Sequence, residues 1–221
     1  MCDRSACSES IIGDFGAHQL VDGYDLGCFV KHRESIKQFG GRVPEFQVKP
    51  AVATDIPRLM TLDHSCQSDY VWQLDLRRDA GQVTANFREV RLPRSIDVLY
   101  PRNPLSLRDE WARRDATFVA VHEKVPVGYL CARVEQVSAV AWVTDLVVAP
   151  EQRRKGAASA LLTATQAWAL ERQVRRLILE MQSKNQPCIR FAQKFGYEFC
   201  GYNDQYYPTQ DVTLYFGRAI K

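Results

Sequence analysis

Residues 143–162, VTDLVVAPEQRRKGAASALL, constrain the fold more than any other stretch of the chain. An apolar run rich in β-branched residues opens the stretch and is typical of a buried strand. Ala149-Pro150 ends that run. After Gly156, small and apolar residues recur at helical spacing. The stretch therefore predicts a buried strand, a tight turn and a helix, as in proteins that mix helices with a central sheet.

The turn in this unit has the chemistry of an anion-binding site. Gly156 lacks a Cβ, so the main chain can bend tightly and approach a ligand closely. The first N–H groups of a helix have no internal partners and carry partial positive charge, which suits a diphosphate. Each hydrogen bond to such a charged group contributes about 1.5–3 kcal/mol. The alternative is an ordinary strand-to-helix turn whose basic residues are simply solvated.

Two common phosphate-binding patterns are missing from this turn. No Gly-Lys-Ser/Thr follows it, and no G-x-G-x-x-G is present. The pattern Arg153-x-x-Gly156-x-Ala158 instead resembles motif A of the GNAT superfamily, which comprises acyl-CoA-dependent N-acetyltransferases.

The downstream sequence is similar to the second half of that superfamily in order and spacing. An apolar strand at residues 177–181 is followed by Asn185, then by Pro187, which suits a first helical turn, and by Gly196-Tyr197 at the helix end. The resemblance covers about residues 46–221, and a more modest likeness extends to the streptothricin- and tabtoxin-type antibiotic acetyltransferases. It implies an α/β (α+β) GNAT fold, with a mixed, mostly antiparallel sheet that splays at the acetyl-CoA site and is flanked by helices.

Composition limits the other classes of function. Of 221 residues, 29 are basic and 26 acidic, and the net charge of +3 does not call for a nucleic-acid or membrane partner. Seven scattered cysteines and four histidines show neither C-x-x-C pairs nor metal-ligand spacing, which favours reduced cytosol and no metal site. No membrane-length apolar run or signal-peptide core is seen, so we expect a cytoplasmic protein.

The chain divides into an N-terminal extension, residues 1–45, and one domain, residues 46–221. In the plainer interpretation the extension packs on the domain or is partly mobile. In the other it forms a lid or a dimer arm, which leaves a homodimer open. Within the domain we expect strands at residues 46–51, 83–91, 96–100, 137–148 and 211–216, a hairpin within 118–134, and helices at 56–63 and 105–114. Residues 64–75 are irregular, and their aromatic side chains either line a substrate pocket or belong to the core.

The resemblance implies which residues bind the cosubstrate acetyl-CoA. Strand backbone groups would pair with the pantetheine arm, turn amides and basic side chains would hold the diphosphate, and two residues would lie beside the pantetheine and sulfur. In that order, the residues are Leu146, Val147 and Val148; Arg153, Arg154, Lys155, Gly156, Ala157 and Ala158; Asn185 and Phe191.

The implied reaction is direct attack of a primary amine on acetyl-CoA in a ternary complex. An amine attacks only when neutral, and a lysine-like amine with a pKa near 10.4 is neutral about once in 2,500 at pH 7. A base therefore matters. Asp145 and Glu180 each interrupt an apolar strand, and a buried carboxylate is suited to accept the proton. The alternative for Asp145 is a carboxylate hydrogen-bonded across the sheet or facing solvent at a bulge.

Two positions depart from the superfamily pattern. Many members carry a tyrosine four residues after the position of Cys188, as general acid for the leaving thiolate, but Ala192 stands here. A missing acid costs about 100-fold in rate, unless one of three tyrosines replaces it: Tyr202, Tyr206 and Tyr207. Arg154 replaces a glycine often found in motif A, which is tolerable if its φ is negative.

The main prediction is an acetyl-CoA-dependent N-acetyltransferase that acts on a small-molecule amine. A protein N-terminal or lysine acetyltransferase is the alternative among enzymes. The absence of the usual tyrosine at Ala192 also keeps a non-catalytic acyl-CoA-binding module open.

Overall fold

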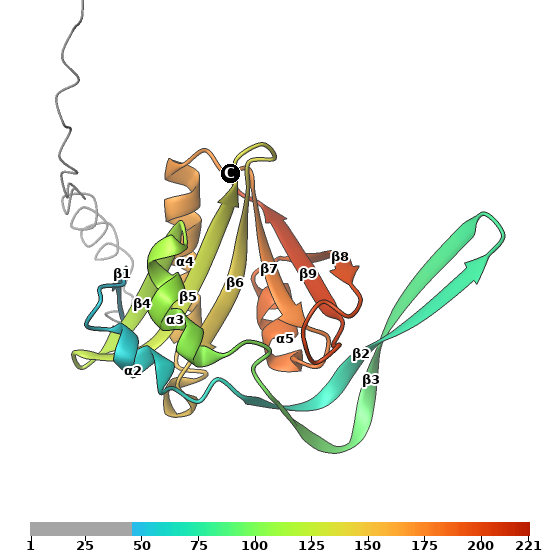
Figure 1. Cartoon of the computed structure of the whole chain (residues 1–221), viewed down its shortest axis with the longest axis horizontal. Coiled ribbons are helices and arrows are strands. Elements are labelled where there is room, and N and C mark those ends of the chain that lie inside the picture. The colour runs from blue at the N-terminus through green and yellow to red at the C-terminus, as the bar shows by residue number, and fades with distance from the viewer. Residues whose placement is uncertain (1–45) are drawn as a thin grey trace, which may run out of the picture. The chain divides into compact units, whose positions relative to one another are not determined.

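The computed structural model describes residues 46–221. The expected extension, residues 1–45, lies outside the described residues. Seven strands form one sheet in the order β1-β4-β5-β6-β7-β9-β8 (Figure 1). Their bounds are β1 Gln47–Pro50, β4 Ala116–His122, β5 Val125–Glu135, β6 Val140–Val148, β7 Arg176–Gln182, β8 Glu198–Asn203 and β9 Thr213–Ala219.

All neighbouring strands in this sheet are antiparallel except β6 and β7, which run parallel. A parallel pair needs a crossover connection, and α4 (Ala157–Glu171) supplies it. The sheet is thus mixed, mostly antiparallel and flanked by helices, which confirms the predicted fold class.

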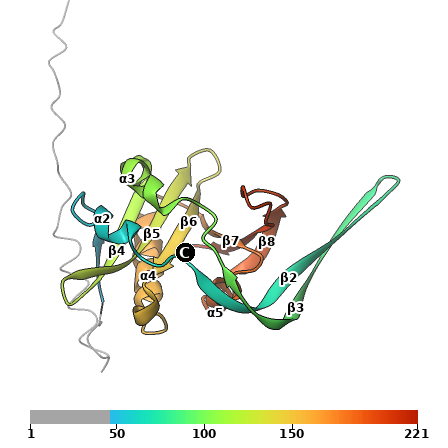
Figure 2. The same ribbon diagram turned by 60° about the horizontal axis from the view of Figure 1, so that its bottom comes forward.

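Helices cover both faces of the sheet (Figures 1 and 2). On one face, α4 and α5 (Gln186–Lys194) pack on a core that includes Leu130, Leu161 and Leu177. On the other face, α2 (Ile56–Met60) and α3 (Leu107–Glu110) cover a smaller core that includes Leu59 and Val119. The alternation of side chains along the strands supplies both cores.

A long two-stranded ribbon extends away from the sheet (Figures 1 and 2). It consists of β2 (Cys66–Asp79) and β3 (Gln82–Val98), which pair antiparallel. Near its base, the side chains of Trp72 and Phe87 pack on Phe199 of β8, and the backbone N–H of Trp72 donates to the Ser183 carbonyl at 2.9 Å.

The ribbon departs from the sequence prediction in two ways. Residues 66–75 form regular strand where an irregular segment was expected. Pro93 does not separate two strands but lies within β3, opposite the register shift between Ser68 and Tyr70. Proline is tolerated there because a bulge removes the need for its missing N–H.

The helix expected at 105–114 is a short α3 flanked by 3₁₀ turns, Pro104–Ser106 and Trp111–Arg113. Among the described residues, no helix is long and apolar enough to cross a membrane.

Candidate active site

The parallel strands β6 and β7 separate partway along their length. They pair only from Val140 to Val143 on β6 and from Arg176 to Leu179 on β7. Beyond Val143, the side of β6 that faces β7 has no strand partner, and a cleft opens between the two. The cleft has a free volume of about 580 Å³, including its open mouth, and the predicted Asp145, Leu146, Val147, Glu180 and Asn185 all line it. Val148 is buried and pairs with Gly128 of β5.

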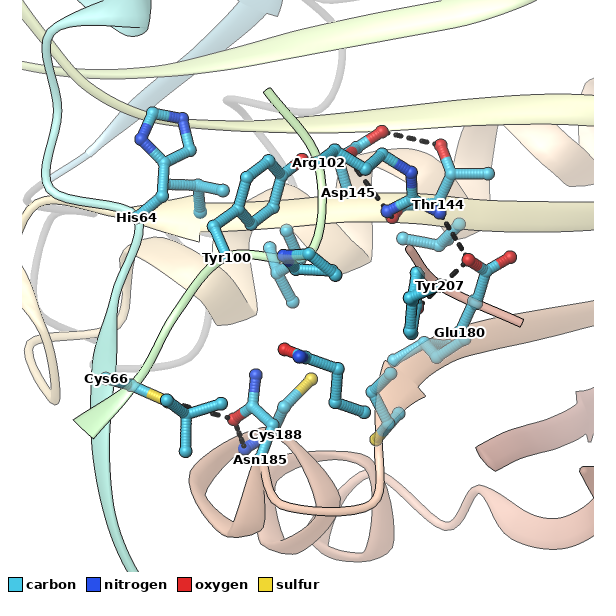
Figure 3. A pocket seen from close by; sticks show the side chains of 18 of the residues that line it. His64, Cys66, Tyr100, Arg102, Thr144, Asp145, Glu180, Asn185, Cys188 and Tyr207 are labelled. Atoms are coloured by element: carbon cyan, nitrogen blue, oxygen red, sulfur yellow. Dashed lines mark hydrogen bonds and ion pairs between the residues drawn. The ribbon is translucent and has the colours of Figure 1, made fainter. Parts of the chain in front are cut away.

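A β-bulge at Thr144 decides where Asp145 points. Asp145 lies opposite Cys131, whereas Val143 lies opposite the next residue, Ala132, so Thr144 is the extra residue on β6. An extra residue reverses the alternation of side chains. Val143 consequently packs in the core under α4, and Asp145 turns to the face that carries α2 and α3. The alternative for Asp145 included a bulge at which the carboxylate faces solvent; the bulge is present, but the carboxylate is buried and lines the cleft (Figure 3).

Arg102 links the two predicted carboxylates (Figure 3). Its guanidinium donates to the Thr144 carbonyl at 2.9 Å and to Asp145 Oδ1 at 3.4 Å, and it forms an ion pair with Glu180. Both carboxylates are buried. Burial alone would lower the pKa of Arg102, but the charges of Asp145 and Glu180 outweigh burial and raise this pKa above its usual value.

Two tyrosines complete the polar wall of the cleft. The Tyr100 hydroxyl donates to Asp145 Oδ1, and the Thr144 hydroxyl donates to Oδ2 at 2.7 Å. The Tyr207 hydroxyl donates to Glu180 at 3.1 Å, and Arg102 lies 5.4 Å from the centre of the Tyr207 ring. Burial, reinforced by the nearby carboxylates, raises the pKa of both tyrosines, so each stays protonated and able to donate.

Sequence reasoning missed Arg102 and Tyr100. They lie in the connection after β3, in the segment Tyr-Pro-Arg-Asn-Pro that signalled only the end of a strand. The ribbon β2–β3 ends beside the cleft, so the connection that follows it brings Tyr100 next to Asp145, 45 residues later in the sequence. Two carboxylates buried in apolar strands, Asp145 and Glu180, call for a nearby cation. The sequence does not show that Arg102 supplies it.

The predicted diphosphate turn connects β6 to α4. Gly156 has φ of 108° and forms the N-cap of α4, with no side chain capping the helix. Within the described residues, no acceptor is recorded for the backbone N–H groups of residues 154–159, whereas the Arg153 N–H bonds to the Pro150 carbonyl. The free donors are therefore displaced by one residue from the predicted set, residues 153–158.

The basic residues of this turn have different roles. Arg153 is structural: its side chain donates to the Val148 carbonyl at 2.8 Å and to the Asp63 carbonyl at 2.9 Å. Arg153 thereby connects the turn before α4 to the segment that follows α2. Arg154 has φ of 64°, so the negative φ that would make it tolerable is not present. A side chain in this left-handed conformation costs roughly 1–2 kcal/mol. Lys155 is exposed.

The α5 end of the cleft contains Asn185 and two cysteines. Asn185 Oδ1 caps the helix by accepting from the Cys188 N–H at 3.1 Å, and the Cys66 thiol lies 3.5 Å from the same oxygen. Burial raises the pKa of Cys188 to about 12, so this thiol stays protonated at neutral pH. The ring of Phe191, predicted beside the pantetheine and sulfur, contacts that of Phe195 with centroids 4.8 Å apart and is not among the residues that line this cleft.

The remaining predicted positions are resolved as follows. Ala192 is fully buried in α5, so its side chain is part of the core. Of the three replacement tyrosines, only Tyr207 lines the cleft, since Tyr202 packs on Phe87 and Tyr206 is exposed.

Of the aromatic segment 64–75, His64 lines the cleft and Trp72 belongs to the packing beneath β8. The described residues contain no cluster of side chains that could hold a metal ion.

These features fit acetyl-CoA as a cosubstrate. The free side of β6 offers unpaired backbone groups to an extended amide-containing chain, and the free N–H groups at the start of α4 offer donors to a diphosphate. Both lie along one route, because the turn follows directly from β6.

Comparison with known proteins agrees with this geometry. A search of curated protein sequences gave no match. Among solved structures, a nourseothricin acetyltransferase has a TM-score of 0.67 at 24% identity, over 80% of this chain and 99% of that one. A putative streptothricin acetyltransferase from Bacillus anthracis, solved with acetyl coenzyme A, has a TM-score of 0.61 at 17% identity, over 79% and 99%.

A protein acetyltransferase has a similar fold. The ribosomal-protein-S18-alanine N-acetyltransferase from Escherichia coli has a TM-score of 0.57 at 16% identity, over 80% of this chain and 94% of that one. At these identities the likeness establishes the fold alone. The sequence model of the acetyltransferase (GNAT) family, however, matches residues 85–197, just over half of the chain. The chain therefore belongs to the GNAT family and is an N-acetyltransferase that uses acetyl-CoA.

Proposed function

We propose that the protein transfers an acetyl group to a primary amine of a small, cationic molecule in a ternary complex. The observation that carries this proposal is the pair of buried carboxylates, Asp145 and Glu180, in the wall of the cleft. One guanidinium, that of Arg102, faces two carboxylates, so this wall keeps one net negative charge. Such a wall favours a cationic acceptor.

When bound, acetyl-CoA supplies the thioester whose acetyl group is transferred. In the proposal, the backbone of Leu146 and Val147 and the amides of residues 154–159 orient it, with Asn185 beside the pantetheine. Asp145 accepts the proton of the attacking amine, because it lies on the strand that borders the cosubstrate and at the cleft surface. Glu180 holds Arg102 and Tyr207 in place.

Tyr207 is proposed as the general acid that replaces the missing tyrosine at Ala192. Its hydroxyl reaches the cleft from the loop between β8 and β9 and remains protonated at neutral pH. We also propose a cytoplasmic location and no nucleic-acid or membrane partner. The four cysteines of the described residues are free thiols, which is compatible with a reducing compartment. A peptide acceptor is the alternative among enzymes, because the S18-alanine N-acetyltransferase is named for a protein acceptor and has a similar fold.

The test measures thiol release from acetyl-CoA with a panel of cationic small amines and a panel of peptides. The proposal expects turnover on small amines, with kcat of Asp145→Asn about 100-fold lower and a changed pH–rate curve. Turnover on peptides alone would replace the small-molecule proposal. An unchanged pH–rate curve in Asp145→Asn would remove Asp145 from the role of base.

A further inference from the structure

The ribbon β2–β3 contacts the turn that precedes α5. Within the ribbon, Trp72 of β2 lies opposite Glu89 of β3. The backbone N–H of Trp72 donates to the Ser183 carbonyl at 2.9 Å. The Glu89 carboxylate accepts from Gln186 Nε2 at 2.8 Å and from the Arg190 guanidinium at 2.6 Å. Two residues that face each other across the ribbon therefore hold both ends of this turn.

Of the two bonds that Glu89 accepts, the one from Gln186 is sheltered from water. Gln186 is 6% exposed, whereas the Arg190 side chain is 60% exposed. Water screens an ion pair with so exposed a partner, and such pairs contribute little. Gln186 is the first residue of α5, so the carboxylate also lies where the helix favours negative charge. The contact between Glu89 and Gln186 thus fixes the start of α5 against the ribbon.

The residue before Gln186 is Asn185, which lines the cleft. Its Oδ1 accepts from the backbone N–H of Cys188 at 3.1 Å. A backbone N–H can only donate, so this bond identifies the oxygen and fixes the orientation of the amide. The Cys66 thiol donates to the same oxygen, and within residues 46–221 Nδ2 has no acceptor. Figure 3 shows this side chain projecting from the start of α5 into the cleft, where its two N–H hydrogens are available to a ligand.

A donor that is held in place binds its ligand at a lower cost than a mobile one. The pantetheine arm and the thioester of acetyl-CoA carry carbonyl oxygens, which are acceptors for such a donor. If the start of α5 were loose, binding would have to order it first, and that ordering would reduce the affinity. The contacts from the ribbon remove this cost before the cosubstrate arrives.

We infer that Glu89 is a positioning residue for acetyl-CoA, because through Gln186 it holds the amide of Asn185 in the cleft. This inference rests on the proposed function, in which Asn185 lies beside the pantetheine. Glu89 itself does not line the cleft, so it acts only through these two neighbours. Its loss should therefore weaken binding of the cosubstrate and leave the chemical step nearly unchanged.

The experiment measures the Kd for coenzyme A by calorimetry, and KM and kcat for acetyl-CoA by thiol release. We expect Glu89→Ala to raise Kd and KM about tenfold, with kcat within about twofold of wild type. Glu89→Gln keeps an oxygen that can accept from Gln186 and should recover most of the affinity. Asp75→Asn is the matched control, because Asp75 pairs with Arg77 inside the ribbon at 3.4 Å; its Kd should stay within about twofold of wild type.

A second variant tests whether the effect passes through Asn185. Asn185→Asp keeps the oxygen that caps α5 but lacks the N–H groups of Nδ2. This variant should itself bind coenzyme A more weakly than wild type. Adding Glu89→Ala to it should weaken binding no further, because both changes remove the action of one donor.

The inference is overturned if Glu89→Ala binds coenzyme A within about twofold of wild type, or if it weakens the Asn185→Asp protein by the same factor as it weakens wild type. Should Glu89→Ala fail to fold, as judged by circular dichroism, Gln186→Leu removes the same hydrogen bond and decides. Wild-type affinity in Asn185→Asp would overturn the proposed role of Asn185 and this inference with it. Because coenzyme A binding needs no amine, the test decides the inference even where turnover on peptides alone overturns the proposed acceptor.

Discussion

Removing the charge of Arg102 tests the electrostatic arrangement of the cleft. Arg102→Met keeps the length of the side chain but leaves Asp145 and Glu180 without their shared cation. Truncating one partner of a buried ion pair costs about 3–5 kcal/mol, because the remaining charge is left uncompensated. Arg102 retains 24% exposure of its side chain, so water can reach the vacated space. We therefore expect the lower end, a loss of about 3 kcal/mol in the free energy of unfolding.

Urea denaturation at about pH 8 measures this loss as a lower midpoint with an unchanged m-value. Arg77→Met is the matched control, because Arg77 is 75% exposed and pairs with an exposed Asp75 at 3.4 Å; we expect it to change stability by less than about 0.5 kcal/mol. Adding Asp145→Asn and Glu180→Gln to Arg102→Met should recover part of the loss, since the uncompensated charges are then gone. An Arg102→Met protein as stable as wild type would refute the reasoning.

Three further predictions concern the backbone and pH. Gly128→Ala should lower stability by more than about 2 kcal/mol in thermal denaturation, because its Cβ would lie 2.7 Å from the Val147 carbonyl oxygen, whereas Gly201→Ala, whose nearest neighbour is a side chain at 3.5 Å, should cost under about 1 kcal/mol. Arg154→Gly should stabilise the protein by about 0.5–1 kcal/mol, because it relieves a left-handed φ of 64°; a loss of stability would contradict this. Folding lowers the pKa of His64, mainly by burial, so below about pH 6.5 the unfolded chain binds more protons than the folded one and stability decreases as the pH is lowered. His64→Gln should reduce the drop in unfolding free energy between about pH 8 and pH 5.5. An equal drop in both proteins would exclude this contribution.

Local signals in the sequence predicted most of the elements that make up the sheet. The apolar runs at β6 and β7 and the glycine at the start of α4 are read from neighbouring residues, and the structure places them as expected. The strand-like continuity of residues 82–98 through Pro93 was not predicted, because a proline reads as a break unless the partner strand bulges opposite it.

The composition of the cleft was harder to predict than the fold. Asp145 and Glu180 were recognisable as charges within apolar strands, but their partner Arg102 comes from a loop whose position depends on the whole ribbon β2–β3. The reversal of alternation at Thr144 depends on pairing with β5, which a single strand's pattern does not reveal. The place of Phe191 beside the pantetheine stays a prediction; its ring contacts Phe195 four residues later, as the spacing of a helix allows.

The account depends most on the main-chain amides at the start of α4 as the site for the diphosphate of acetyl-CoA. Titration of ¹⁵N-labelled protein with coenzyme A, followed by amide NMR, tests this directly. We expect saturable binding, with the largest shifts at the N–H groups of residues 154–159 and smaller ones at Leu146 and Val147. Saturable binding that leaves the amides of residues 154–159 unshifted, or no binding at all, would contradict the account.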